Sequence, residues 1–360
     1  MKGENVMALL HPEYQLAYER IFNGAVGQRL RKQPVPEKLY HYTQSFDAVK
    51  GIIAERTMWL TNMAFLNDVA ELDYIKSFEQ EEGLDPLVRD YLRAYQPLMA
   101  DLYTQNYVMS FSSKKDYLPL WATFTKMKGY AIGFDTVSLQ NHVFSKQTLN
   151  VEVLRNPSAL HGAVEALLEQ QTSGYEKQGS FGGAWNLYPV IYDRVQQLAI
   201  LNTTVKSAIQ TFIDVKRTAE QGYAQTVIQV GDKEVGRIVK DEAAFTNALN
   251  KVFNFCATLF KSDDYAYEHE WRFVKEMNTN NHHLLRSQVF TREADGAIIP
   301  YIKMKLRNDL SFPVTDIVTA PLNSFETNVP ALSFVLHDAG YLLENSGVKL
   351  EQSVIRLRRF

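Results

Sequence analysis

The sequence predicts an α+β protein with a mixed or antiparallel sheet and a helical insertion. Three observations support this. Short aromatic-rich segments that alternate with period two recur along the chain, and each is typical of a strand. They do not alternate regularly with helices, which argues against a doubly wound sheet. The chain also has 360 residues and 46% hydrophobic residues, enough to bury a large core in about two domains.

The first third of the chain predicts a short helical lead followed by the body of the fold. Residues 8–30 have a helical pattern, and the prolines near residue 35 interrupt it before the first strand. Strands are expected at 38–43 and 58–61, with a helix over 46–56 between them. Another helix is expected to begin at Asn67.

The middle of the chain changes from strands to helices. A strand is predicted at 107–112, and Pro119 suits the first turn of a short helix that Gly129 ends before a strand at 130–135. Residues 156–261 read as a helical insertion. The expected division is therefore a lead over 1–37, an α+β domain over 38–155 and 262–360, and the insertion between its halves.

The last third predicts strands and one helix. A strand is expected at 265–275, followed by apolar strand-like segments at 288–291, 297–305 and 314–319. A helix over 324–341 would end near Gly340, and a last alternating strand is expected at 348–358.

Composition and missing motifs narrow the function classes. A net charge of −3 provides no basic field for binding duplex nucleic acid. The single cysteine, Cys256, lies in an apolar helical pattern and forms no disulfide within the chain. The sequence has no P-loop, no G-x-G-x-x-G after a strand, no H-E-x-x-H and no G-x-S-x-G, so kinases, Rossmann dehydrogenases, α/β-hydrolases and metal catalysis lose support. We expect no bound metal.

The N-terminal residues contain no unbroken apolar segment of the signal-peptide type. No run approaches the roughly 18 apolar residues of a membrane span. We therefore expect a cytoplasmic protein that does not bind membranes.

The most informative segment is Tyr265–Lys275 (YAYEHEWRFVK), which splits into an aromatic face and a charged face when read as a strand. Glu268, Glu270 and Arg272 share the charged face. Residues i and i+2 of a strand lie roughly 6 to 7 Å apart, so both carboxylates could address one polyol or one developing cation. The alternative is a solvated outer face with a surface ion pair.

Several segments together resemble the bacterial family catalogued as Domain of Unknown Function 2971. They are LYHYT at 39–43, MWLTNMAFLNDVAE at 58–71, SFSSKKDYLPLWATFTKMKGYAIGF at 110–134, YEHEWRF at 267–273, AIIPYIK, DIVTAPL and SVIRLR. This likeness spans most of the chain apart from the helical insertion.

The order of a first-strand His, a middle strand with Ser and a late Glu-x-Glu also resembles ADP-ribosyltransferases. That resemblance implies a split sheet that binds NAD as substrate, without a metal. His41 would hold the adenosine-side ribose, Ser110 or Ser112 would line the nicotinamide end, and Glu270 would be the key carboxylate. The sequence has Ser-Phe-Ser at 110–112 and His at 41, and so mixes features of two subclasses.

The chemistry of NAD cleavage gives the other residues roles. Positive charge develops on the ribose as the nicotinamide bond breaks, so Glu270 would stabilise the transition state. Glu268 would activate the acceptor or raise the pKa of its neighbour. Arg272 would pair with Glu270 or bind a phosphate. Trp59, Tyr42 and Trp121 are candidates for stacking on nicotinamide or adenine.

The sequence therefore predicts an NAD-dependent ADP-ribosyltransferase-like enzyme, which would transfer ADP-ribose to a nucleic acid, a protein or water. An intracellular toxin or phage-defence effector would fit this activity. The alternative is a non-catalytic module that binds a nucleotide, a nucleic acid or a protein. The enzyme requires His41, the Ser110 strand and Glu270 to converge, whereas the binding module does not.

Overall fold

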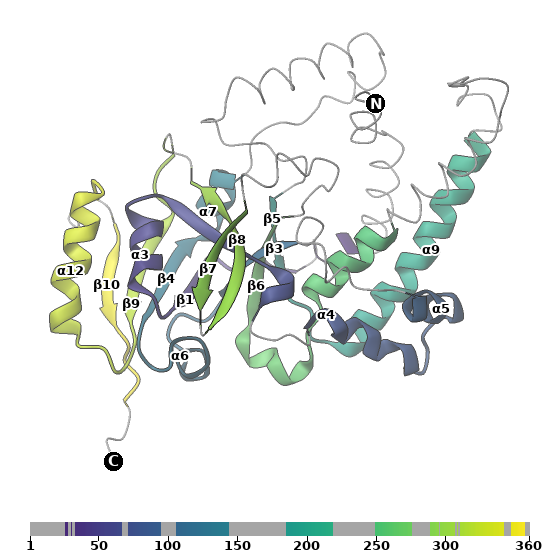
Figure 1. Ribbon diagram of the computed structural model, residues 1–360, viewed down its shortest axis with the longest axis horizontal. Helices are drawn as coiled ribbons and strands as arrows, with labels where there is room; N and C mark the ends of the chain where they lie inside the picture. Colours follow the sequence, from purple (N-terminus) through teal and green to yellow (C-terminus); the bar gives the residue numbers. More distant parts are fainter. Residues whose placement is uncertain are drawn as a thin grey trace, which may run out of the picture.

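A computed structural model describes most of the fold (Figure 1). The described residues are 26–27, 30, 33–66, 71–94, 106–143, 185–218, 249–275, 289–294, 296–306, 308, 310–341 and 347–356. Most of the predicted N-terminal lead and much of the predicted insertion lie outside these ranges, as does the expected helix start at Asn67.

The described residues form a mixed, mostly antiparallel sheet of ten strands in an α+β fold. Along its main path the order is β10-β9-β4-β1-β3-β2-β8-β7, and β6 joins β3 to β5. Only β10 and β9 pair in parallel among these strands. The strands are β1 (Lys38–Thr43), β2 (Thr57–Asn62), β3 (Tyr107–Ser112), β4 (Tyr130–Asp135), β5 (Trp185–Pro189), β6 (Glu270–Lys275), β7 (Val289–Ala294), β8 (Ala297–Lys305), β9 (Val314–Thr319) and β10 (Lys349–Gln352).

The sheet branches at β3. One edge of β3 pairs with β6 along its whole length, from Tyr107 to Ser112. The other edge is shared, because Tyr107 and Val108 pair with β2 whereas Ser112 pairs with Tyr40 of β1. Strands β1 and β2 therefore diverge from β3 on either side of Ser110.

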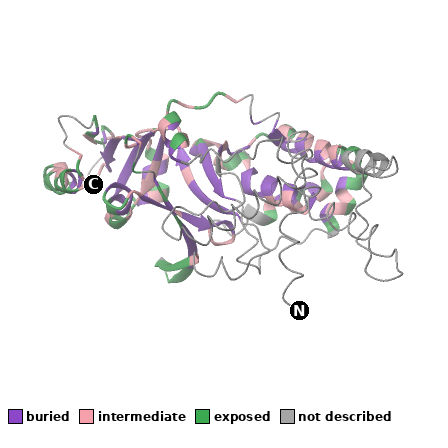
Figure 2. Ribbon diagram, turned by 90° about the horizontal axis from the view of Figure 1, so that it is seen from above, coloured by how far each residue is buried: buried purple, intermediate pink, exposed green. Residues whose placement is uncertain are grey.

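One face of the sheet is covered by α3 (Phe46–Ile53), α7 (Thr136–Val143) and α12 (Phe325–Asp338). Strand residues such as Leu39, Phe111 and Phe273 form the apolar core beneath them. Ser45 caps α3, since its hydroxyl accepts a hydrogen bond from the Ala48 N–H at 3.3 Å. Figure 2 shows that buried residues extend along most of the strands.

A second core lies beside the sheet, on the right in Figure 1. It joins α9 (Arg194–Thr218), α5 (Pro86–Ala94), the helical residues 249–259 and a turn of η4 (Ile75–Gln80). Val108 of β3 and Val274 of β6 belong to this core. The short elements α4 (Glu71–Tyr74), η3 (Met63–Phe65) and η7 (Asp263–Glu268) connect the parts, and α6 (Leu118–Thr125) packs on β1.

Most predicted strands and helices of the described residues are confirmed, but three expectations are wrong. Residues 265–268 belong to the 3₁₀ helix η7, so the strand begins only at Glu270. β5 lies within the segment predicted to be helical, and it extends the sheet by pairing with β6. The last strand is short, and it ends at Gln352. Within the described ranges, no helix is both long and apolar enough to cross a bilayer.

Gly129 is required where α6 turns into β4. Its φ is 137°, and an added Cβ would lie 2.9 Å from the Gln44 Cα, closer than such atoms pack. The Gly129 carbonyl also accepts hydrogen bonds from the Ala320 N–H and from Asn323. The backbone of this turn therefore has little freedom to shift.

We expect Gly129→Ala to lower the free energy of unfolding by about 1 to 3 kcal/mol more than Gly340→Ala does. Gly340 is the matched control because it has a φ of 83° but open space around its Cα. Urea denaturation of both variants measures the difference. Equal losses would mean that the turn relaxes around the added methyl group.

Candidate functional site

Four charged side chains lie together in the interior, where β6 meets the second core. Lys261, Glu268, Glu270 and Arg272 are 6%, 3%, 5% and 1% exposed. Lys261 Nζ lies 2.6 Å from Glu268 Oε2 and 3.5 Å from Glu270 Oε2. Two cations thus face two carboxylates, and we call these four residues the buried charge cluster.

Arg272 binds Glu270 with two parallel hydrogen bonds. Its Nε donates to Glu270 Oε1 at 2.8 Å, and its Nη2 donates to Oε2 at 3.0 Å. The remaining nitrogen, Nη1, donates to the Thr258 carbonyl at 2.6 Å. This bidentate geometry fixes the Glu270 carboxylate in one orientation.

Glu268 and Glu270 converge although they do not lie on one strand. Glu268 ends η7 and Glu270 begins β6, and His269 between them has a left-handed backbone with a φ of 47°. Such a conformation is uncommon outside glycine and is held here because the His269 carbonyl accepts from the Ser113 N–H at 3.2 Å. Glu268 and Glu270 lie close together as predicted. The turn at His269, and not a shared strand face, brings them together.

The serines of β3 line the cluster. Ser110 pairs with Arg272 and Ser112 with Glu270 across the two strands. The side chain of Ser110 lies beside the Glu270 carboxylate and helps to lower its pKa. The Ser112 hydroxyl instead donates to the Glu268 carbonyl at 2.7 Å, so it holds the end of η7.

His41 lies at the branch of the sheet. Its Nδ1 lies 2.9 Å from the Ser110 carbonyl, which can only accept, so Nδ1 carries the proton and Nε2 offers a lone pair in the neutral ring. Burial and the charge of Arg292 lower the pKa of His41, against the hydrogen bond to Ser110. The His41 ring also packs edge-on against Phe111, and the register places both rings on the face of β3 opposite to Glu270.

Glu270 is held ionised. Burial by itself would raise its pKa, but the charges of Arg272 and Lys261, together with hydrogen bonds from Arg272 and Ser110, bring the pKa below its ordinary value of 4.5. The negative charge of Glu268 does not raise the pKa of Glu270 above its ordinary value, because Lys261 contacts both carboxylates and Arg272 pairs with Glu270.

The three candidate stacking residues lie in different environments. Trp121 is fully buried, and its Nε1 donates to Asp116 at 2.6 Å. Tyr42 packs edge-on against Trp121 at 4.8 Å and donates to the carbonyls of Lys114 and Lys115. Trp59 is partly exposed on β2. Trp121 is therefore enclosed, whereas Tyr42 and Trp59 both keep part of their surface exposed.

Sequence reasoning missed Lys261 and Tyr192. The Tyr192 hydroxyl accepts a hydrogen bond from the Glu270 N–H at 3.1 Å, and burial followed by the charge of Glu270 raises its pKa. Lys261 ends the apolar helical pattern that contains Cys256. A lysine that directly follows a mostly apolar helical segment could have been noticed in the sequence, but only the fold determines its partners.

The alternative of a solvated outer face is wrong for these residues, since the charged face of β6 is covered by the second core. The cluster can act in two ways. It can hold one carboxylate ionised next to a ligand, or it can be a compensated network that fixes β6 against the helices. In the part of the chain that the structure describes, no group of three or more His, Cys, Asp or Glu side chains is arranged to hold a metal.

Comparison with known proteins finds one family model that matches part of the chain. Residues 120–273 match the family described as "Protein of unknown function (DUF2971)". The matched region runs from α6 into β6, and so it contains the buried charge cluster but neither His41 nor Ser110. No curated protein and no solved structure matches the chain.

We expect Lys261→Met to lower the free energy of unfolding by about 3 to 5 kcal/mol, because two buried carboxylates would then share one cation. Adding Glu268→Gln to this variant should recover part of the loss, which a double-mutant cycle measures. Arg93→Met is the control, since Arg93 and Glu79 form an ion pair with side chains 58% and 39% exposed. We expect it to cost about 0 to 1 kcal/mol. Additive losses at Lys261 and Glu268 would contradict the contact.

The stability due to Glu270 should depend on pH. Because its pKa is lowered in the fold, its charge stabilises the protein fully above about pH 4.5, and this contribution disappears as the pH falls through the lower folded pKa. Glu270→Gln should therefore be less stable than the wild type at pH 7, by about 3 kcal/mol, and the gap should narrow below pH 4.5. Thermal melts across this range measure it, with samples returned to pH 7 as the control for reversibility. A gap that stays constant would show that Glu270 is not held ionised by folding.

Proposed function

We propose that this protein is an NAD-consuming enzyme of the ADP-ribosyltransferase type. The observation that supports the proposal best is the buried, ionised carboxylate of Glu270 beside Ser110, with the His41 ring hydrogen-bonded to the Ser110 carbonyl. These three residues come from β1, β3 and β6, which are far apart in the sequence.

In the proposed reaction, the bond between the ribose C1′ and the nicotinamide nitrogen breaks, and its electron pair leaves with nicotinamide. An acceptor nucleophile then forms the new bond to C1′ and loses its proton. The acceptor is water or a nucleophile of a nucleic acid or a protein. A fixed negative charge beside C1′ stabilises the cationic transition state more than the ground state.

The residues around Glu270 fit this role in definite ways. Arg272 and Lys261 keep the Glu270 carboxylate ionised, and the side chain of Ser110 also lowers its pKa. The Nε2 lone pair of neutral His41 can accept a hydrogen bond from a ribose hydroxyl. Glu268 lies 2.6 Å from Lys261, and a proton from the acceptor would reach Glu268 only if Lys261 shifted toward Glu270. Such an activity suits an intracellular toxin or a phage-defence effector.

One observation favours the second candidate, a non-catalytic binding module. Both oxygens of Glu270 already accept hydrogen bonds from Arg272, and the carboxylate is 5% exposed. A carboxylate that is fully paired in this way stabilises the fold, and a substrate would have to compete with Arg272 for it. The two candidates therefore differ in whether Glu270 contacts a ligand.

We expect purified protein incubated with NAD to release nicotinamide. Glu270→Gln should release it at least about a hundredfold more slowly, because the substitution removes the charge that favours the transition state. Chromatography of the released base measures both rates, with cell extract supplied as a source of acceptors. Glu326→Gln, at an exposed position of α12, is the matched control.

If neither form releases nicotinamide, and NAD does not raise the melting temperature of the wild type, the enzymatic proposal is wrong and the binding module remains. Retained release in Glu270→Gln would instead remove Glu270 from the chemistry.

A further inference from the structure

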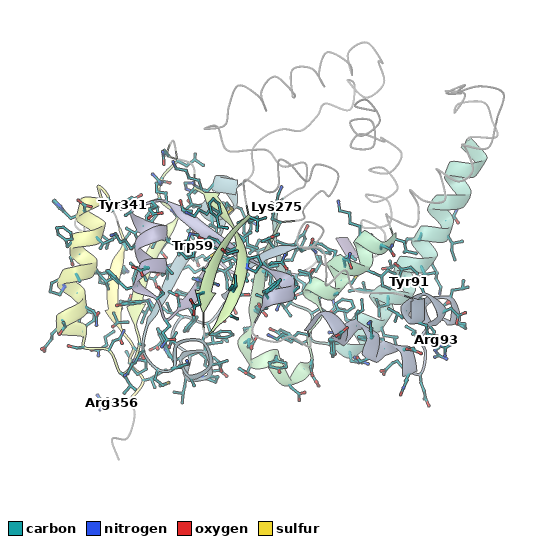
Figure 3. All side chains as sticks on the ribbon, in the orientation of Figure 1. Trp59, Tyr91, Arg93, Lys275, Tyr341 and Arg356 are labelled. Carbon is teal, nitrogen blue, oxygen red and sulfur yellow. The ribbon has the colours of Figure 1, made fainter. Side chains whose placement is uncertain are left out.

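An aromatic surface with positive charge lies on β2, β8 and β7, apart from the buried charge cluster. Cross-strand partners share a face, and the register pairs Thr61 with Tyr301 and Tyr301 with Phe290. Trp59 lies on the same face, two residues before Thr61. Figure 3 labels Trp59 beside strands β7 and β8, which lie at the front of this view.

The three rings form a continuous row. The centroids of Trp59 and Tyr301 are 4.8 Å apart, and those of Tyr301 and Phe290 are 5.7 Å apart, each pair tilted by 33°. Tyr301 is buried, whereas Phe290 is 40% exposed and Trp59 is partly exposed. The buried middle ring thus holds two accessible rings in fixed positions.

Cations flank the row on both sides along the strands. Lys303 Nζ lies 4.7 Å from the centroid of the Phe290 ring, and Lys303 pairs with Trp59 in the register. Arg292 Nη2 donates to the Thr61 hydroxyl at 3.2 Å. In the sequence of these three strands the one carboxylate is Glu293, which follows Arg292 and so points to the opposite face. The aromatic surface is therefore positively charged.

One polar atom of this surface has no partner. The Trp59 Nε1 is buried and makes no hydrogen bond within the described part of the chain. Native structures seldom leave a buried donor unpaired, but this atom is closed to solvent, so a ligand on the surface would meet the ring of Trp59 and not its Nε1. The Nε1 atom is shielded from water, while part of the Trp59 ring remains accessible.

We propose that this surface, formed by Trp59, Tyr301, Phe290, Arg292 and Lys303, binds single-stranded nucleic acid. Every base has a π-face that stacks on Trp or Phe, and lysine and arginine next to the rings pair with the phosphates. Bases of a duplex do not present their faces, so the surface selects single strands. The inference goes beyond the proposed NAD chemistry and does not depend on it.

Fluorescence anisotropy with a labelled oligothymidylate or oligouridylate of about twelve nucleotides tests the proposal, with no NAD present. We expect binding that weakens markedly between about 50 and 200 mM salt. Phe290→Ala should weaken it about tenfold, because stacking is lost. Arg292→Gln should weaken it at low salt and reduce the salt dependence. Trp59→Phe keeps a ring and removes the Nε1 donor, and we expect a smaller loss than for Phe290→Ala.

The matched control is Phe334→Ala on α12, since Phe334 is also an exposed aromatic, at 68%. It should bind the strand as the wild type does, and melting curves confirm that all variants fold. Absence of binding by the wild type, equal binding by Phe290→Ala, tighter binding to a duplex of the same sequence, or equal affinity for thymidine monophosphate would each overturn the proposal. Because NAD is absent, failure of nicotinamide release would leave this result unaffected.

Discussion

The structure depends on charge compensation at one buried position, the pairing of Arg272 with Glu270. A buried guanidinium or carboxylate without its partner would carry a desolvation cost of several kcal/mol, which is a large part of the stability of a domain. Lys261 extends the pairing to Glu268, so the four charges cancel. This is what allows the polar face of β6 to lie against an apolar helical core at Val274.

The same pairing ties together segments that are distant in the chain. Arg272 also donates to the carbonyl of Thr258, in the helical residues 249–259, while Ser110 of β3 lies beside Glu270. The branch of β3 also brings His41 of β1 against the Ser110 carbonyl, on the face of β3 opposite to Glu270. A stabilising network and a candidate active site consequently share their residues, and this is why loss of stability and loss of activity have to be measured separately here.

Much of the fold follows from local patterns. The aromatic alternation of β1, β3 and β4 and the capping serine of α3 identify these elements, because period and capping are properties of short segments. The pattern of Tyr265–Lys275 was misleading, since η7 shows the same spacing of aromatic and acidic residues as a strand would. β5 was missed because five residues beside long helical patterns carry little signal.

The sequence by itself determined the α+β class, most strands, the apolar helix around Cys256, and the choice of Glu270, Glu268 and Arg272 as residues of interest. Only the tertiary structure decided that these charges are buried, that Lys261 joins them, and that Trp59 lies beside Tyr301 and Phe290 on another surface. The physical reason is that periodicity fixes which side of an element a residue occupies, whereas its partners depend on strand pairing and helix packing between distant segments.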